Sequence, residues 1–299
     1  MPRYSKGAFI YNGNAGAGKL EQKLSQTIPT LAQNVENLTV LQTQSRDDMI
    51  EKCKEYGKKV EVLFVLGGDG TVHDTVNALA ELDSRPVVGV LPGGTCNDYA
   101  RMLGLPQDLY QATQALVNGE ERYVDIGKTK DHYFTNFWGI GLVAETSTNV
   151  DPAQKNRFGV LSYFISAMKS MNEATPFNYK ITVDGETAFH DQAVVVLVLN
   201  GRYIGTRMVP IPDLSLDDGK FDILIVKSST LTSFRELLTM NSPDNEKYQE
   251  LYHIQGERVE IETEEQMEID SDGEINSTTP DSIELVPNHL RMLFHQNAE

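Results

Sequence analysis

The sequence predicts a two-domain protein, with an α/β domain built on a parallel sheet followed by an antiparallel β domain. The chain has 299 residues, which is more than one hydrophobic core usually organises. Up to about Asp125, short apolar runs alternate with helix-like stretches, and beyond it strand-like runs follow one another closely. These three observations together define the fold class.

Four apolar runs in the first domain predict parallel strands. They are Ala8–Tyr11, Leu38–Leu41, Val60–Leu66 and Val87–Leu91. Helices are expected at about 17–35, 46–57, 72–82 and 96–118, with Pro29 interrupting the first and Pro106 dividing the last. Ligands of such sheets bind beyond the carboxyl ends of the strands, so the loops after these runs are the candidate site.

The second domain is predicted from strand-like runs separated by turn residues. The runs are Tyr133–Phe137, Phe177–Val183, Ala193–Leu199, Phe221–Val226, Arg258–Glu262 and Ile283–Val286. Asp184 and Gly185 indicate a hairpin turn, and a helix is expected over Val160–Met171. We therefore place the domains at 1–125 and 126–287, and the segment at about 288–299 is a candidate to return to the first domain.

Composition indicates a globular protein and excludes some partners. Asp and Glu number 43 against 26 Lys and Arg, a net charge of -17, so nucleic acid is not an expected partner. Cys53 and Cys96 form no disulfide or zinc pattern, and no apolar run is long enough to be a transmembrane segment. Without a signal-peptide pattern, we expect a cytoplasmic protein, which would visit the membrane surface if its substrate is a lipid.

A first glycine-rich turn, Asn12–Lys19, follows the first predicted strand. It fits the P-loop pattern except at Leu20, where a Ser or Thr would hold magnesium, so a Walker A site is not expected. Its small residues could still let backbone N–H groups approach a phosphate at the start of a helix. A tight turn without a ligand is an equally good interpretation of this loop alone.

A second turn, Gly67–Thr71, is the strongest indication of nucleotide binding. Three glycines within four residues carry an entropic cost on folding that a simple turn does not require. They are explained if the backbone approaches a phosphate, with Asp69 directed at a magnesium ion and Thr71 opening the next helix. A third turn, Pro92–Asp98, ends another strand of the same sheet, although Asn97 or Asp98 could simply cap the helix that follows.

Two acidic turns of the second domain are weaker signals. Ser215–Lys220 offers hydroxyl, carboxylate and carbonyl oxygens, which suit magnesium but also fit an ordinary Asp-Gly turn. Asp270–Glu274, taken alone, is typical of a hairpin turn with solvated charges.

Taken in order, these motifs resemble the diacylglycerol kinase catalytic family, in particular its bacterial lipid kinases of the YegS and BmrU type. The resemblance covers nearly the whole chain and also includes Asn136–Gly141 and Leu216–Gly219. It implies a β-sandwich as the second domain, and an enzyme that uses ATP and Mg²⁺ to phosphorylate a lipid hydroxyl. Diacylglycerol is the acceptor that the family suggests by default.

The resemblance also implies a role for each matching residue. The nucleotide would be surrounded by Asn12, Gly13, Asn14, Ala15, Gly16, Thr43, Gly67, Gly68, Asp69, Gly70, Thr71 and Thr95. Asp69, Asp98 and Asp125 would organise magnesium and water near the phosphates. Ser215, Asp218 and the carbonyl of Lys220 would hold a second, structural magnesium ion. The implied catalytic residues are Glu274, as general base, and Asp69.

Two other functions stay open at this stage. An NAD kinase shares the Gly67–Thr71 turn but phosphorylates a ribose hydroxyl, and the Asp272–Glu274 turn favours the lipid kinase instead. A non-catalytic nucleotide-binding regulator is the second alternative. The sequence does not indicate which lipid is the acceptor, how the membrane is contacted, or whether the chain forms a homo-oligomer.

Overall fold

The computed structural model describes residues 2–13, 19–141, 176–211, 213–228, 230–240 and 248–295. It divides into two compact units, one made of Met1–Val124 with Asn288–Glu299 and the other of Asp125–Pro287. Strands β5 (Glu120–Lys128) and β18 (Asp281–Phe294) each begin in one unit and end in the other. The helix expected over Val160–Met171 lies outside the described residues.

The first unit is built on a parallel sheet that contains the four predicted strands. These are β1 (Tyr4–Asn12), β2 (Val35–Thr43), β3 (Val62–Gly67) and β4 (Val87–Pro92). Their order is β2-β1-β3-β4, and the end of β18 extends the sheet by pairing Arg291 with Val87. β3 and β4 are buried along their whole length, which explains why their sequences are continuously apolar rather than alternating.

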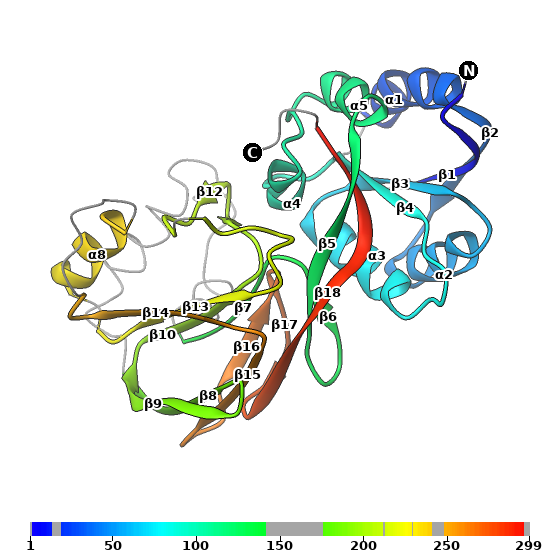
Figure 1. The fold of residues 1–299 in the computed structure, drawn as a ribbon. Coiled ribbons are helices and arrows are strands. Elements are labelled where there is room, and N and C mark those ends of the chain that lie inside the picture. The colour runs from blue at the N-terminus through cyan, green and yellow to red at the C-terminus, as the bar shows by residue number, and fades with distance from the viewer. Residues whose placement is uncertain are drawn as a thin grey trace. The chain divides into compact units, whose positions relative to one another are not determined.

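Helices cover both faces of this sheet (Figure 1). α1 (Leu20–Asn34) and α5 (Leu109–Val117) pack together on one face, and α2 (Arg46–Gly57) and α3 (Asp69–Ala80) on the other. The side chain of Ser45 accepts the N–H of Asp48 and so caps the start of α2. A short helix, α4 (Asp98–Met102), precedes α5, and Pro106 lies between them as predicted.

The prediction that Pro29 interrupts the first helix is wrong, because α1 runs through this residue. A proline removes one helical hydrogen bond, here the one to the carbonyl of Ser25. Both residues are exposed, so water can hydrate that carbonyl, while Thr27, Thr30 and Leu31 are buried. Packing of the buried side chains therefore outweighs the local cost of the proline.

Cys53 lies in the core of the first unit, among Ile10, Leu63 and Val65. Burial raises the pKa of its thiol to about 12, so the reactive thiolate is suppressed near neutral pH. We expect a thiol reagent at pH 8 to titrate at most Cys96 in the folded protein, and both cysteines after denaturation. A Cys96→Ala variant that still reacts rapidly while folded would contradict this.

The second unit is an antiparallel β-sandwich, as the resemblance implied. One sheet has the order β14-β13-β10-β7-β16-β17, and the other joins β15, β8 and β9 to the first part of β18. The strands of the first sheet are β14 (Leu251–Gly256), β13 (Phe221–Val226), β10 (Val195–Leu199), β7 (Phe137–Gly141), β16 (Glu268–Ser271) and β17 (Glu274–Thr278). Those that join β18 are β15 (Arg258–Thr263), β8 (Phe177–Val183) and β9 (Glu186–Ala193).

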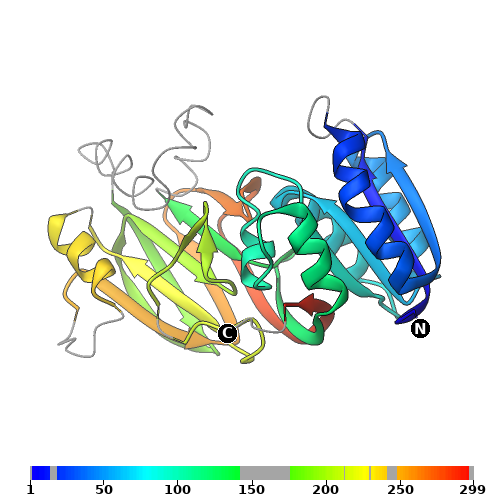
Figure 2. The same cartoon turned by 90° about the horizontal axis from the view of Figure 1, so that it is seen from above.

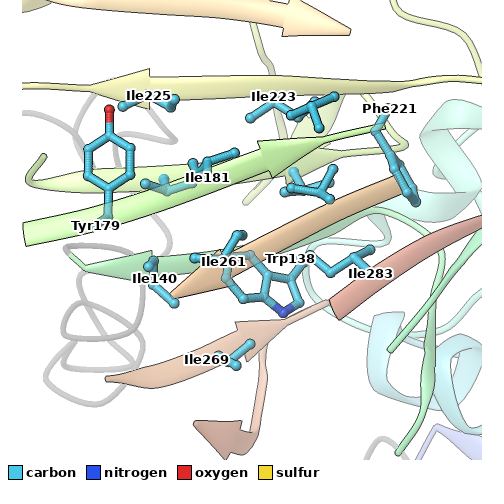
Figure 3. Packing of buried hydrophobic residues seen from close by; sticks show 14 of the residues in the cluster. Trp138, Ile140, Tyr179, Ile181, Phe221, Ile223, Ile225, Ile261, Ile269 and Ile283 are labelled. Carbon is cyan, nitrogen blue, oxygen red and sulfur yellow. The ribbon is translucent and has the colours of Figure 1, made fainter. Parts of the chain in front are cut away.

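Side chains of both sheets meet in one core (Figure 3). Trp138 and Ile223 come from the first sheet, and Ile181, Ile261 and Ile283 from the second. The outer face of β10 and β13 is covered by a second apolar cluster, to which α8 (Leu231–Leu238) contributes Leu237. Figure 2 shows the ribbon of both units from above. Among the described residues, no helix is both long and apolar enough to cross a membrane.

Three short strands complete the second unit. β6 (Tyr133–Phe134) pairs with β5, and β11 (Tyr203–Ile204) pairs with β12 (Arg207–Met208). The run Tyr133–Phe137, predicted as one strand, is therefore two strands, β6 and the start of β7. It breaks because the backbone N–H groups of Thr135 and Asn136 bond to the carboxylate of Asp272.

Candidate functional site

The glycine-rich turns of the first unit lie at one edge of its sheet. In the strand register, Asn12 is opposite Thr43, Tyr11 is opposite Leu66, and Gly67 is opposite Pro92. The carboxyl ends of all four parallel strands therefore coincide, and the three predicted turns leave the sheet together. Of the first turn, Asn14, Ala15 and Gly16 lie outside the described residues.

The second and third turns pack backbone against backbone. The N–H of Gly93 donates to the carbonyl of Gly67 at 2.8 Å. A Cβ added to Gly94 would lie 2.5 Å from the Cα of Gly68, and one added to Gly93 would lie 3.0 Å from the backbone nitrogen of Gly67. Glycine is thus required for the two turns to approach each other, and backbone rather than side chain lines this part of the edge.

Helix α3 begins directly at the second turn. Its first residue is Asp69, so Gly70 and Thr71 belong to its first turn, and the expectation that Thr71 opens the helix is wrong by two residues. Gly68 precedes the helix without a side-chain cap. N–H groups in the first turn of a helix have no partner within it, and together with the helix dipole they favour an anion such as a phosphate.

The carboxylate of Asp69 connects α3 to α4. Its Oδ1 accepts the backbone N–H of Tyr99 at 3.1 Å, immediately after Asp98, and the side chain of Asp98 is buried. The structure therefore brings Asp69 next to the helix start that carries Asp98. These are two of the three aspartates predicted to organise magnesium.

The third turn is shaped by Asn97 rather than capped by it. Asn97 has a φ of 52° at the N-cap position of α4 and makes no capping hydrogen bond. Its Oδ1 instead accepts the N–H of Gly94 at 2.8 Å, while its Nδ2 donates to the carbonyl of the same glycine at 3.2 Å. Lys23 of α1 also donates to the carbonyl of Gly93, a contact that no sequence motif indicated.

The remaining predicted nucleotide residues of this unit differ in exposure. Thr95 is exposed in the third turn, whereas Thr43 is buried. The hydroxyl of Thr43 donates to the carbonyl of Tyr11 at 3.2 Å, and its own carbonyl accepts the N–H of Gly13 at 3.0 Å. Thr43 thus fixes the point where the first turn leaves the sheet.

Asp125, the third predicted magnesium aspartate, belongs to the second unit and is almost fully buried there. Its Oδ2 accepts the N–H of Gly219 at 2.8 Å, and its backbone N–H donates to the carbonyl of Leu216 at 2.7 Å. The structure therefore places Asp125 against the Ser215–Lys220 turn, the predicted structural magnesium site. The sequence did not predict this contact, because nothing in the spacing of Asp125 and the Ser215–Lys220 turn indicates that they bond to each other.

The Ser215–Lys220 turn concentrates negative charge. Partial desolvation raises the pKa of the Asp218 carboxyl, the charges of Asp222 and Asp125 raise it further, and the N–H of Lys220 opposes them. No group of three or more His, Cys, Asp or Glu side chains in the described ranges is arranged to hold a metal. The predicted ligands are one carboxylate, one hydroxyl and one carbonyl. Such oxygen ligands, together with the negative charge of the neighbouring carboxylates, are compatible with a bound cation.

Glu274 begins β17, next to a tight turn between β16 and β17. Ser271 pairs with Glu274, while Asp272 and Gly273 occupy the turn with φ of 55° and 91°. The turn predicted at this position is therefore confirmed as a hairpin, but the expectation that its charges are solvated is wrong for Asp270, which is fully buried. The carboxylate of Asp272 bonds to the segment that begins the Asn136–Gly141 motif, so the structure brings these two motifs together.

Comparisons with known proteins agree with this architecture. The description "Diacylglycerol kinase catalytic domain" matches residues 6–129, and "YegS C-terminal NAD kinase beta sandwich-like domain" matches residues 138–294. A protein of Staphylococcus aureus strain JH9, named "Putative lipid kinase", is 31% identical over 298 residues, covering 97% of each chain.

Solved structures extend the likeness to three dimensions. A Bacillus anthracis structure titled "putative diacylglycerol kinase" has a TM-score of 0.89 at 37% identity, and covers 98% of both chains. An NAD kinase from Archaeoglobus fulgidus in complex with ATP shares only the fold, with a TM-score of 0.51 at 11% identity over 98% of this chain and 94% of that one.

An α/β domain with backbone-lined turns and a C-terminal sandwich of this kind define the class of diacylglycerol kinase-like proteins. Within that class, the chain belongs to the diacylglycerol kinase catalytic family, with a C-terminal domain of the YegS type.

Proposed function

We propose that this chain is an ATP-dependent lipid kinase that transfers the γ-phosphate of ATP to the hydroxyl of a diacylglycerol-like lipid. The observation that carries the proposal is the close backbone packing of the Gly67–Thr71 and Pro92–Asp98 turns at the N-terminus of α3. A lipid acceptor is favoured by membership of the diacylglycerol kinase catalytic family. The acceptor would be met at the membrane surface.

Phosphoryl transfer depends mainly on positioning and on neutralising charge. The first-turn N–H groups of α3 and the neighbouring glycine turns would bind the phosphates, with Thr95 and the Asn12–Gly16 turn as further contacts. Asp69, Asp98 and Asp125 would hold magnesium and its water, and the bound metal would supply charge neutralisation at the β- and γ-phosphates.

Glu274 would act on the acceptor. Its carboxylate takes the hydroxyl proton as the lipid oxygen forms a bond to the γ-phosphorus, and the bond from that phosphorus to the leaving oxygen of ADP breaks. The products are a phosphorylated lipid, ADP and a protonated Glu274, which then returns its proton to solvent. General base catalysis of this kind contributes about 10²–10⁴-fold in rate.

Ser215, Asp218 and the carbonyl of Lys220 would hold the structural magnesium ion, which predicts a cation-dependent stability. Because burial raises the pKa of Asp218 in the folded protein, the free energy of unfolding falls as pH rises above the usual range of an aspartate, and the deficit persists at neutral pH. We expect Asp218→Asn to be at least as stable as the wild type at pH 7 without Mg²⁺. At a Mg²⁺ concentration of 100 times its Kd, the wild type should gain about 2.7 kcal/mol in free energy of unfolding, and the variant should gain little.

Urea unfolding with and without MgCl2 measures this difference. Asp217→Asn is the matched control, because it removes the same charge from the neighbouring position of the turn. The hydroxyl of Ser215 donates to Oδ1 of Asp217 at 2.6 Å, and the amide oxygen of Asn can still accept this bond. An equal response to Mg²⁺ in wild type and Asp218→Asn would show that the turn does not bind the ion.

The proposed activity is tested by incubating the pure protein with labelled ATP and Mg²⁺. Three acceptors are compared: dioleoylglycerol in phospholipid vesicles, a bacterial lipid extract, and NAD. Label in a lipid supports the proposal, and mass spectrometry of the extract identifies the lipid. Label in NAD alone would establish an NAD kinase, and tight ATP binding without transfer to any acceptor would establish a non-catalytic binding protein.

A further inference from the structure

The carboxylate of Asp272 is bonded to three consecutive residues of another segment. Its Oδ2 accepts the backbone N–H of Thr135 at 2.9 Å and the hydroxyl of Thr135 at 3.2 Å. Its Oδ1 accepts the N–H of Asn136 at 2.8 Å and that of Phe137 at 3.1 Å. Asp272 also donates its own N–H to the carbonyl of Phe137 at 3.0 Å. Four donors on one carboxylate fix both the position and the orientation of this side chain.

These bonds hold the hairpin that carries Glu274. Asp272 lies at the first turn position and Glu274 two residues later, at the start of β17. The other side of the turn is fixed as well, because Oδ1 of buried Asp270 accepts the N–H of Gly273 at 2.8 Å. The backbone immediately before Glu274 therefore has little freedom to move relative to Thr135–Phe137.

The segment Thr135–Phe137, which bonds to Asp272, is also hydrogen-bonded to residues in the interior. The carbonyl of Asn136 accepts the N–H of Asn200 at 2.9 Å and that of Gly201 at 2.8 Å. The buried Asn200 side chain donates from Nδ2 to the carbonyl of Thr135 at 2.8 Å and to that of Asp125 at 3.0 Å. Asp272 is thus joined, through a continuous set of hydrogen bonds, to the strand that supplies Asp125.

We propose that Asp272 is the positioning residue for Glu274, and that its carboxylate fixes the hairpin in the geometry needed for proton removal from the acceptor hydroxyl. The inference rests on the proposed function of Glu274. Asp272 does not act on the substrate itself, because its oxygens are directed at the backbone of Thr135–Phe137. Its contribution lies in keeping the base within reach of the acceptor.

The kinetic test uses Asp272→Ala and Asp272→Asn with dioleoylglycerol vesicles and Mg-ATP. Small misplacements of a catalytic group cost up to about 10²-fold, so we expect kcat of Asp272→Ala to fall by about 10- to 100-fold. Asn keeps one acceptor oxygen and tolerates a positive φ, so its loss of kcat should be smaller. The KM for ATP should stay within about twofold in both variants, because neither change touches the proposed nucleotide turns.

Asp184→Ala is the matched control. Asp184 occupies the same position in the β8–β9 hairpin, with φ of 51° followed by Gly185 at 85°. Its Oδ1 accepts the N–H groups of Glu257 and Arg258 at 3.0 and 2.9 Å, so its removal also frees backbone donors in the sandwich. Asp184→Ala should lower the melting temperature without lowering kcat. Equal losses of kcat at matched stability in Asp184→Ala and Asp272→Ala would overturn the proposal.

Hydrogen exchange measured by mass spectrometry gives a readout that needs no activity. We expect the peptides that contain residues 133–138 and 270–276 to exchange faster in Asp272→Asn and Asp272→Ala, and to be unchanged in Asp184→Ala. Wild-type exchange at both peptides in the Asp272 variants would overturn the inference, as would faster exchange with an unchanged kcat. If the wild type phosphorylates no lipid, the proposed function fails separately, and exchange alone decides whether Asp272 holds the hairpin.

Discussion

Replacing Glu274 by Gln is expected to abolish phosphate transfer and leave ATP binding nearly intact. Gln has almost the same shape as Glu but cannot take a proton, so the variant should lose the roughly 10²–10⁴-fold that a general base contributes. The proposed nucleotide turns belong to the first unit, whereas Glu274 begins β17 in the second. Transfer of label to dioleoylglycerol measures the first effect, and titration calorimetry with ATP measures the second.

Glu268→Gln is the control for this experiment. Glu268 is exposed at the start of β16, in the same hairpin as Glu274, and the substitution makes the same change of charge. It should retain the wild-type rate. Parallel loss of transfer and ATP binding in Glu274→Gln would count against the base role, since it would indicate damage to the fold or to the nucleotide site.

Replacing Gly94 by Ala is expected to weaken both the first unit and its binding of ATP. The new Cβ would lie 2.5 Å from the Cα of Gly68, and a backbone atom cannot rotate away as a flexible side chain could. The two turns would have to separate, at an overpacking cost of about 1–3 kcal/mol. Since the same turns are proposed to bind the phosphates, ATP affinity should fall by at least about tenfold, equivalent to about 1.4 kcal/mol.

Gly68→Ala provides a graded comparison at the same contact. A Cβ there would lie 3.1 Å from the Cα of Gly94, a tight contact that a shift of a few tenths of an ångström relieves. Urea unfolding should therefore rank the two variants, with Gly94→Ala the less stable. Wild-type stability in Gly94→Ala would show that the two turns are not packed as described.

Much of the fold was predictable where local sequence pattern and burial agree. β3 and β4 are continuous apolar runs because both faces of each strand are covered, and β13 is buried along its whole length with Asp222 as its one charged residue. The strand β9 was missed because its side chains are nearly all exposed, so it has no apolar pattern to detect. The turn between β16 and β17 was predicted as a hairpin, but the bounds of its strands were not, because their polar residues leave no apolar run to detect.

The candidate site was predictable to the extent that glycines in parallel strand-to-helix turns gather at one sheet edge. The sequence could not show that Gly94 and Gly68 must both be glycine for their turns to pack together, because that requirement arises from the approach of two separate turns. It also offered a cap as a role for Asn97, whereas the side chain closes a loop onto Gly94. Spacing along the chain describes neighbours in sequence, and these contacts join residues that only folding brings together.

The sequence by itself therefore determined the family, the two fold classes and the identity of the glycine-rich and acidic turns, since these depend on residue type and local order. Only the tertiary structure decided which turns support one another. It placed Asp125 against Gly219 and showed that Asp272, which the sequence identified only as a member of the Glu274 turn, is bonded to Thr135, Asn136 and Phe137. The physical reason is that a carboxylate withdrawn from water, fully for Asp125 and partly for Asp272, must find donors, and the donors lie more than 90 positions away along the chain.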